Sequence, residues 1–470
     1  MKTECNTKSI EFHPLNRRNV LGQFDGGAIT SDAGGLLLRE VEQKAHIIRQ
    51  FAGCFTDYRS KILVEHSLQE LIAQRVYALA LGYEDLNDHD ELRHDPLLAL
   101  LVGKRDPEGR NRFRLRDQGK ALAGKSTLNR LELGEPGTVP PRNSYKKIII
   151  DPTHVERFFV ELFIQAHDEP PDEIVLDLDA TDDPLHGDQE GRFFHGYYQS
   201  YCYLPLYVFC GEFLLGAKLR QSNIDASAGA VEELARIVGQ IREQWPGVKI
   251  TIRADSGFCR EAIMAWCEEH GVDYVLGLAK NDRLKAAITD ELTEAKDLYE
   301  QTQTAARVFK EFQYRTHKSW TRSRRVIAKA EHLPKGLNPR FIVTSLAGDP
   351  RELYEDIYCA RGEMENRIKE QQLYLFADRT STSKLASNQI RLWFSSVAYM
   401  VMQTLRRVAL KGTQLAKAQC HTMRLKLLKL GAHVRITVRK IWLSFSEAYP
   451  YANIFRQAFE NLRRWRPMRC

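Results

Sequence analysis

Residues 173–278 alternate between short apolar runs rich in β-branched residues and longer amphipathic runs. The run "EIVLDLDA" predicts a strand, "YCYLPLYVFCGEFLLGAKLR" predicts a hairpin turning at Cys210-Gly211, and "VKITIRADSG" and "DYVLGLA" predict two further strands. Between them, "SAGAVEELARIVGQIREQW" and "REAIMAWCEEHG" predict helices. Because strands that alternate with helices usually pair in parallel, this stretch predicts an α/β domain with parallel neighbouring strands.

Acidic residues interrupt the first of these strands. The segment "EIVLDLDATDD" carries Asp177, Asp179, Asp182 and Asp183, although a carboxylate is costly to bury. Side chains alternate along a strand, so Asp177 and Asp179 share one face, with Asp179 nearer the carboxyl end. Asp255 ends the strand "VKITIRA". Since sites in open α/β sheets form at the carboxyl ends of strands, we expect Asp179 and Asp255 to face each other if the two strands are parallel neighbours.

A long helix is predicted over "DPRELYEDIYCARGEMENRIKEQQLYL". Tyr358, Arg361 and Glu365 are spaced i, i+3 and i+7 and therefore share one face, which Lys369 extends. A surface ladder of ion pairs is the commoner meaning of such a stripe. The other interpretation is a metal ligand beside bound phosphate, since three carboxylates suit Mg²⁺ or Mn²⁺ rather than zinc.

Positive charge is concentrated in two parts of the chain. Residues 381–470 hold 17 Lys/Arg and 2 Glu, and residues 104–147 hold 12 Lys/Arg and 5 Asp/Glu. This asymmetry favours nucleic acid as a partner, with solvated helix faces as the alternative. The start "MKTECNTKSIEF" shows no secretory signal, and "IRLWFSSVAYMVMQTLRR" is too interrupted to span a bilayer. Nine scattered cysteines without a CxxC pair argue for a reducing compartment and against a zinc site.

The segment "GKALAGKS", Gly119 to Ser126, matches the phosphate-binding pattern G-x-x-x-x-G-K-[ST]. That motif needs an apolar strand before the loop, whereas the preceding "RNRFRLRDQ" is basic. We therefore predict no nucleotide cofactor, and we interpret the segment as a basic turn and helix in which Lys125 and Arg130 contact DNA. His89 and His94 are five residues apart and are predicted to be surface residues rather than metal ligands.

Two Pro-rich stretches, "LGEPGTVPPRNS" and "HDEPPDE", indicate domain boundaries. We expect residues 1–168 to form a mostly helical DNA-binding region and residues 169–300 to form the first part of the α/β domain. Residues 301–347 read as strands and predict a β-rich insertion. Residues 348–384 contain the long helix, which we expect to complete the α/β domain, and residues 385–470 predict a basic helical region.

Three blocks in order, "DLDATD", "IRADSGF" and "YCARGEMEN", resemble the catalytic blocks of DDE transposases of bacterial insertion sequences. The likeness is greatest to the group with a Tyr-Arg-Glu-Lys signature, and within it to the insertion-sequence family numbered thirteen-eighty. It covers most of the chain, including "QFDGGAITSDAGGLLL" and "STLNRLE". The resemblance implies an α/β fold: an RNase H-like catalytic domain with a β-rich insertion, flanked by mostly helical N- and C-terminal regions.

The resemblance also implies roles for individual residues. Asp179, Asp255 and Glu365 would be the catalytic acids and would hold two Mg²⁺ ions, with Mn²⁺ accepted in their place. Tyr358 and Arg361 match the signature and would contact DNA.

The position of the signature Lys is Gln372 in this chain, and Lys369 is the candidate substitute one turn earlier. In the insertion, the resemblance implies that Trp320, beside Arg324 and Arg325, stacks on a displaced base. A Trp in the core of the β region is the alternative.

These observations lead to the hypothesis of a DNA transposase. It would bind the terminal inverted repeats of an insertion sequence, cut a strand to free a 3′-OH, and join that end to target DNA as a homodimer. It would act in the bacterial cytoplasm at the nucleoid. An RNase H-like nuclease without strand transfer and a catalytically silent DNA-binding protein derived from a transposase are the alternatives. Asp177 is interpreted as a supporting or structural acid, and Asp182 and Asp183 as turn residues.

Overall fold

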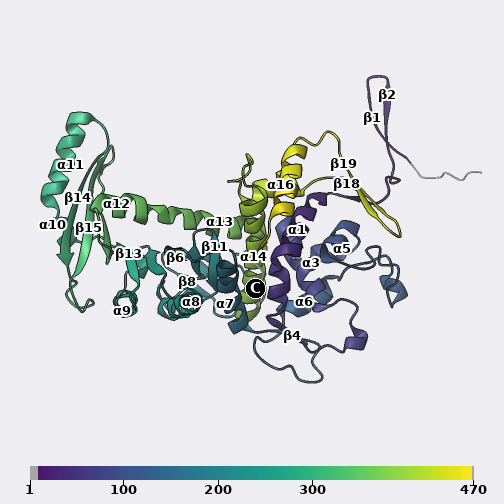
Figure 1. Cartoon of the computed structure of the whole chain (residues 1–470), viewed down its shortest axis with the longest axis horizontal. Helices are drawn as coiled ribbons and strands as arrows, with labels where there is room; N and C mark the ends of the chain where they lie inside the picture. Colours follow the sequence, from purple (N-terminus) through teal and green to yellow (C-terminus); the bar gives the residue numbers. More distant parts are fainter. Residues whose placement is uncertain (1–8, 468–470) are drawn as a thin grey trace, which may run out of the picture. The chain divides into compact units, whose positions relative to one another are not determined.

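The computed structural model describes residues 9–467 (Figure 1). Contacts divide the chain into two compact units. Unit 1 contains the residues up to 49, 59–131 and 404–465; unit 2 contains residues 50–58, 132–403 and those after 465. The N- and C-terminal regions therefore contribute to one unit, and the segments 169–300, 301–347 and 348–384 all lie in the other.

A large mixed sheet forms the centre of unit 2. Its first five strands, in spatial order, are β11 (Phe213–Lys218), β10 (Leu206–Cys210), β6 (Glu173–Ala180), β12 (Lys249–Ala254) and β13 (Asp273–Leu278). β12 pairs in parallel with both β6 and β13, which confirms the predicted parallel neighbours. β10 and β11 form the predicted hairpin, and Gly211 at its turn has a φ of +55°.

The same sheet continues through the segment predicted as an insertion. After β13 come β17 (Arg340–Thr344), β15 (Arg324–Leu333) and β14 (Ala306–Tyr314), all antiparallel, with the short β16 (Gly336–Leu337) paired to β15. Two helices precede them, α10 (Asp282–Ala286) and α11 (Thr289–Thr302), and α11 packs on β14 and β15 (Figure 1). The predicted strands thus exist, but they extend the large sheet of unit 2 instead of forming a sheet of their own.

Helices cover this sheet in unit 2. They are α7 (Pro152–Gln165), α8 (Ala230–Gln244), α9 (Glu261–Glu269) and α14 (Leu385–Thr404). Asp151 caps α7 by accepting from the backbone N–H groups of Thr153 and His154, and Pro152 occupies the first turn. α14 is the apolar stretch noted in the sequence, and most of its residues are buried. Within residues 9–467, no helix is long and apolar enough to cross a membrane.

Small strands complete unit 2. β4 (Phe55–Asp57) pairs with β5 (Ile148–Ile150). β7 (Asp183–Pro184), β8 (Phe193–His195) and β9 (Ser200–Tyr203) form a three-stranded sheet between β6 and β10 in the chain.

The helix predicted over 349–375 is present but irregular. It begins with α12 (Pro350–Glu352), passes through a π-helical turn (Leu353–Tyr358) and a 3₁₀ turn (Cys359–Arg361), and continues as α13 (Gly362–Leu375). The π-helical turn contacts β13, and α13 contacts β6 (Figure 1). π turns often occur at functional sites, because they change the direction of the side chains that follow.

Unit 1 combines helices with two hairpins. Its elements are β1 (Ile10–Leu15), β2 (Arg18–Gly22), β3 (Ile29–Thr30), α1 (Leu36–Ala45), α2 (Ile47–Ala52, shared with unit 2), α3 (Leu68–Leu81), α4 (His89–Leu92), α5 (Pro96–Val102), α6 (Lys125–Glu132, whose last residue belongs to unit 2), α15 (Cys420–Met423), β18 (Ala432–Ile436), β19 (Ile441–Phe445) and α16 (Ala452–Arg464). A capping box between Ser67 and Glu70 starts α3. The basic C-terminal region therefore contains a β-hairpin as well as helices.

His89 is not the surface residue that its spacing suggested. It is fully buried, and its Nδ1 lies 3.0 Å from Nε2 of Gln74 on α3. Burial lowers the pKa of His89 to about 3, so the imidazole is neutral at physiological pH. Its role is to pack α4 against α3, whereas His94 is exposed as predicted.

Candidate active site

Two parallel strands place Asp179 and Asp255 side by side. Arg253 of β12 is opposite Asp177 of β6, and Ala254 is opposite Leu178. An aspartate follows each residue of the second pair: Asp255 follows Ala254, and Asp179 follows Leu178. Both aspartates lie at the carboxyl ends of the two strands. Asp179 lies in the strand, whereas Asp255 leaves it and accepts from the backbone N–H of Gly257 at 2.8 Å. This is the juxtaposition that strand geometry predicts.

The helix that carries Glu365 approaches this edge closely. A Cβ at Gly277 on β13 would lie 2.5 Å from the hydroxyl oxygen of Tyr358 and 2.9 Å from the backbone nitrogen of Ser256. Glycine at position 277 therefore lets the tyrosine reach the turn that follows Asp255. The ring of Tyr358 packs against a cluster of Val275, Ile342 and other buried side chains, which anchors the helix to the sheet.

Arg361 links two of the three acids. Its Nη2 donates to Oε1 of Glu365 at 2.6 Å, and its Nη1 lies 3.5 Å from Oδ2 of Asp179. The guanidinium of Arg361 therefore contacts both Glu365 on α13 and Asp179 on β6, so that these two carboxylates share one positive charge. The stripe predicted on the helix does face the strand acids, since Tyr358, Arg361 and Glu365 all point to this edge of the sheet.

Burial is the main influence on the charge of Asp179. It raises the pKa of this carboxyl to about 7, and the negative charges of Asp255 and Glu365 act in the same direction. The positive charge of Arg361 and the N–H of Ala180 lower it only in part. Asp179 therefore keeps its proton more readily than an exposed aspartate does, as long as Arg361 is the cation beside it.

These properties suit a divalent cation. Carboxylate oxygens are the ligands that Mg²⁺ and Mn²⁺ prefer, and a buried carboxylate with a raised pKa gains most from an added positive charge. Among the described residues, no three acidic, histidine or cysteine side chains are arranged to hold one ion together. The guanidinium of Arg361 contacts two of the carboxylates, Asp179 and Glu365, which with Asp255 would be the residues to hold such a cation.

Asp177 has a partner of its own. Nε and Nη2 of Arg253 donate to its two carboxylate oxygens at 2.5 and 2.8 Å, and both side chains are buried. Nη1 of the same arginine donates to the backbone carbonyl of Ile357 at 2.5 Å, in the π-helical turn. Asp177 is therefore a structural acid that, through Arg253, fixes the helix carrying Tyr358, Arg361 and Glu365.

The departure from the family signature also has a structural explanation. Gln372 donates from Nε2 to Oδ1 of Asp183 at 2.9 Å and to the carbonyl of Asp182 at 3.0 Å. Gln372 thus binds the turn that follows Asp179 and also binds the first residue of β7, instead of facing solvent. Lys369 is exposed, one turn earlier on the same helix.

Asp183 is a buried acid whose charge should control stability. Burial raises its pKa to about 8, and one of its oxygens has no hydrogen-bond partner. Because the folded pKa exceeds the unfolded value, this group favours folding most below about pH 4, and its contribution falls by about 1.4 kcal/mol per pH unit up to about pH 8. Asp183→Asn should therefore raise the unfolding midpoint at pH 8 and change it little at pH 4, as measured by urea denaturation.

Asp182→Asn is the matched control, because Asp182 is the neighbouring residue in the chain and its side chain is partly exposed. It should leave the pH dependence of the midpoint unchanged. If Asp183→Asn and the unmodified protein lose stability equally between pH 5 and 8, the assignment of a neutral carboxyl at position 183 is wrong.

The insertion residues predicted to contact DNA are engaged within the fold. Trp320 is 4 % exposed and its ring meets that of Tyr314 edge-on at 5.7 Å, which matches the alternative of a core tryptophan. Arg324 is buried and bonded to Glu261 and Glu268 of α9. Arg325 bonds to Glu311 and to the carbonyl of Leu346. A DNA contact by these three side chains stays a prediction and would require them to leave these partners.

The residues of the phosphate-loop look-alike lie in unit 1. No strand leads into Gly119; a short 3₁₀ turn, Leu115–Asp117, precedes it. Lys125 starts α6, and its ammonium lies 3.4 Å from Asp90. Arg130 is partly exposed, and its side chain has no hydrogen bond or ion pair with any residue between 9 and 467. It is thus the freer of the two predicted DNA contacts.

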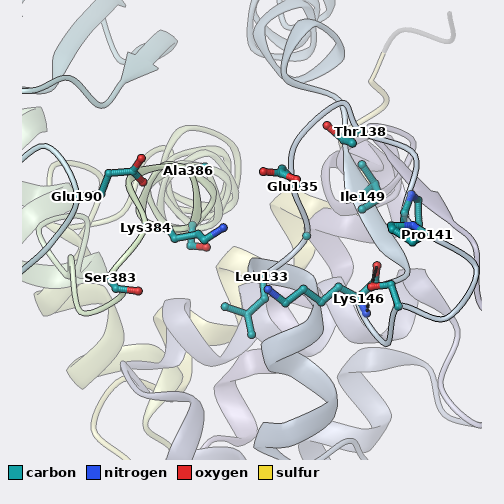
Figure 2. A pocket seen from close by; sticks show the side chains of 14 residues that line it. Leu133, Glu135, Thr138, Pro141, Lys146, Ile149, Glu190, Ser383, Lys384 and Ala386 are labelled. Atoms are coloured by element: carbon teal, nitrogen blue, oxygen red, sulfur yellow. Dashed lines mark hydrogen bonds between the residues drawn. The ribbon is translucent and has the colours of Figure 1, made fainter.

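A pocket of about 450 Å³ lies elsewhere in unit 2, at the start of α14 (Figure 2). The side chains of Lys146 and Lys384 reach into it from two different segments, and Glu135 and Glu190 lie at its border (Figure 2). None of the three acids of the sheet edge lines it. Because none of these acids lines it, the pocket has no part in the site described above.

Sequence reasoning missed two groups near the acids. One is Arg253. Side chains alternate along "KITIRA", and the pairing of β12 with β6 puts Arg253 opposite Asp177 and on the same face of the sheet. The alternation of the strand residues was therefore the signal for this pair. The other is the aromatic segment 192–201, "RFFHGYYQSY", which contains five aromatic rings in nine positions. The density of aromatic residues in a polar, glycine-containing stretch was the signal for it.

Comparison with known proteins gives two findings. The family model described as "Transposase DDE domain group 1" matches residues 12–467. The chain is also similar to a cryo-EM structure of the piggyBac transposase synaptic complex with hairpin DNA, at 11 % identity and a TM-score of 0.41, over 85 % of this chain and 80 % of that one. No curated protein matches the chain. The family match spans both units.

Proposed function

The chain belongs to the group 1 family of DDE transposase domains and is a DNA transposase, and we propose that Asp179, Asp255 and Glu365 form its catalytic centre. One observation supports this most directly. The carboxyl ends of two adjacent parallel strands present Asp179 and Asp255, and a single guanidinium joins Asp179 to Glu365 on the helix above them.

We further propose that β11, β10, β6, β12 and β13 are the RNase H-like core of this enzyme. The mixed strand order of the sheet supports this proposal. The β10–β11 hairpin lies beside β6 and is antiparallel to it, and the parallel strands lie on the other side of β6. The acids lie where the pairing changes from antiparallel to parallel. The sequence blocks around Asp179, Asp255 and Tyr358 further support membership of the Tyr-Arg-Glu-Lys signature group and of the family numbered thirteen-eighty, with Gln372 as the departure.

DDE transposases work with divalent metal ions, and we propose that the three carboxylates hold two Mg²⁺ or Mn²⁺ ions. When bound, such ions neutralise phosphate charge and polarise the reacting oxygens of a phosphodiester. The side chains contribute the negative charge that retains the ions, and the buried setting of Asp179 strengthens that attraction.

Arg361 has a second task in this proposal. Its guanidinium neutralises Asp179 and Glu365 in the absence of metal. With a cation on these carboxylates, Arg361 would be available to the DNA, where a planar guanidinium can donate to two oxygens of one phosphate. Tyr358 is held beside the turn after Asp255 and orients this end of the helix. Positioning and charge neutralisation, rather than covalent catalysis, are the protein's contribution.

The DNA partners follow from the function. We propose that the terminal inverted repeats of an insertion sequence and a target DNA bind, that two copies of the chain act together, and that the reaction takes place at the bacterial nucleoid. Basic residues 104–147 and 381–470 supply charge for phosphate contacts. Exposed Lys369 would extend these contacts along α13.

A strand-transfer assay separates the transposase from its alternatives. Radiolabelled, pre-cut element ends are incubated with target plasmid and Mg²⁺, and joined products are resolved by electrophoresis. Joining of the 3′-OH ends is the expected result. Cutting of intact ends without joining would instead support an RNase H-like nuclease, and DNA binding without either reaction would support a silent DNA-binding protein.

Salt dependence tests the phosphate contacts. With about 6–10 phosphates neutralised, the affinity for duplex DNA should fall by about 10³–10⁵ between 50 and 200 mM salt. Arg130→Ala should make the slope of log affinity against log salt about one unit shallower, because this guanidinium has no ion-pair partner in the described chain. Lys296→Ala, on acidic α11, is the matched control and should leave the slope unchanged. An unchanged slope in Arg130→Ala would remove α6 from the DNA surface.

A further inference from the structure

Segment 192–201 forms a hairpin with an aromatic surface, which we name the aromatic hairpin. β8 and β9 pair so that Phe194 is opposite Tyr201, and their rings meet edge-on at 5.5 Å. The guanidinium carbon of Arg192 lies 3.9 Å from the centre of the Tyr201 ring. In the turn, the ring of Tyr198 lies 5.0 Å from that of Tyr197. The hairpin therefore carries two groups of rings in edge-to-face contact, and the guanidinium of Arg192 lies over the Tyr201 ring of one of them.

These rings are unusually exposed. The exposed fractions are 39 % for Phe193, 53 % for Phe194, 84 % for Tyr197 and 44 % for Tyr201. Burial of an aromatic side chain is normally worth several kcal/mol, and exposed apolar patches on soluble proteins usually mark binding sites. The exposed rings therefore offer a binding surface to a ligand with flat apolar faces.

The hairpin is held in place by hydrogen bonds from outside it. Ser222 Oγ donates to the carbonyl of Phe193 at 3.0 Å, and Tyr203 Oη donates to the carbonyl of Glu190 at 2.6 Å. Gln189 Nε2 donates to the carbonyl of Thr380 at 3.0 Å. The aromatic surface is thus fixed before any ligand arrives, which lowers the entropic cost of binding.

The same hairpin touches the strand that ends in the catalytic centre. Tyr198 Oη donates to the carbonyl of Ala180, the residue after Asp179, at 3.3 Å. Burial raises the pKa of Tyr198, and the negative charges of Asp182, Asp179 and Asp255 raise it further. Tyr198 therefore bridges the exposed rings and the acids.

We propose that the aromatic hairpin is a stacking site for unpaired bases of the DNA strand next to the phosphate that is cut. This inference rests on the proposed catalytic centre and adds to it a binding site for single-stranded nucleotides. Every base has a flat face, so stacking on Phe194, Tyr197 and Tyr201 tolerates any sequence, and Arg192 extends the platform by cation–π contact.

Charge favours bases over the phosphate backbone as the occupant. Arg192 is the one arginine or lysine in the hairpin, and it is already paired with Asp188 at 3.1 Å. Asp182 and Asp188 flank the surface and would repel a phosphate backbone. Continuity with the acids favours nucleotides that leave the duplex at the cut, rather than DNA far from the reaction.

The test uses full-length protein in EDTA, so that no cleavage occurs. The probe is a hairpin duplex with a short single-stranded flank that carries 2-aminopurine beside the junction. Binding of the unmodified protein should quench the fluorescence through stacking. The double variant Phe194→Ala/Tyr197→Ala should lose the quench and bind the flanked probe about tenfold more weakly, with unchanged affinity for a fully paired duplex. Tyr197→Phe, which keeps the ring, should retain both properties.

Tyr145→Ala is the matched control, because it removes another exposed tyrosine of unit 2 and should change neither signal. Equal quenching and affinity in the double variant and the unmodified protein would overturn the proposal. A loss of self-association with intact quenching would also overturn it, since the surface would then bind a second copy of the chain. These readouts do not depend on cleavage, so failure of the catalytic assignment, seen as normal cleavage by an Asp255 variant, is separately detectable.

Discussion

Asp255→Asn is expected to reduce Mg²⁺-dependent cleavage of element ends by more than about 100-fold while leaving DNA binding intact. Changes to groups that only orient a metal ligand cost about 10–100-fold, so the loss of a ligand itself should cost more. The asparagine retains an oxygen that can accept from Gly257 N–H, so the turn after β12 should persist. Cleavage rates at saturating Mg²⁺ and duplex affinity by gel shift give the two readouts.

Asp225→Asn provides the matched control for this variant. Asp225 is an exposed aspartate that pairs with Arg260, close in the chain to Asp255 but outside the acidic centre. Cleavage in this control should stay within about twofold of the unmodified rate, as for most surface substitutions. Undiminished cleavage in Asp255→Asn would exclude Asp255 from the catalytic centre. Other acidic residues would then have to form the active site of this transposase.

Asp177→Ala is expected to lower the free energy of unfolding by about 3–5 kcal/mol, the largest loss of stability among the variants considered. The change leaves the guanidinium of Arg253 buried without its carboxylate, and an unpaired buried charge is costly. Urea denaturation followed by tryptophan fluorescence measures the loss. A decrease below about 1 kcal/mol would show that water or another group compensates Arg253.

A double variant separates the stability of this pair from its role in positioning. Asp177→Leu/Arg253→Met removes both charges, and such replacements are often neutral or stabilising. The variant should therefore recover the stability lost in Asp177→Ala. It lacks the hydrogen bond to the Ile357 carbonyl, so the helix with Arg361 and Glu365 should be less well fixed and cleavage should remain low. Recovery of both stability and cleavage would reduce the pair to a structural role.

Much of the catalytic sheet was predictable because its strands carry strong local patterns. The β-branched runs at 173–180 and 249–254 and the hairpin turn at Gly211 each define a strand from a few adjacent residues. The pairing of β6 with β12 followed from the helix between them. The extension of this sheet through β17, β15 and β14 was not predictable, because a run of antiparallel strands can pair within itself and nothing in its local pattern shows that β17 also pairs with β13.

The surroundings of the predicted DNA contacts in the insertion, in contrast, could not be predicted from the sequence. Trp320 and Arg324 look accessible in a basic segment, "HKSWTRSRR". In the fold, two glutamates on α9 bind Arg324, and Tyr314 packs on Trp320. No local pattern in 317–325 could reveal partners that approach from another helix and another strand.

The sequence alone therefore determined the candidates for the chemistry of this protein: three ordered acidic blocks, strands that end in Asp179 and Asp255, and a helix face with Arg361 and Glu365. Only the tertiary structure decided how that chemistry is held. It paired Asp177 with Arg253, buried Asp183 against Gln372, and set the aromatic hairpin beside Ala180. The physical reason is that periodicity along a chain orders side chains within one element, whereas burial and ion pairing depend on elements that meet across the sheet.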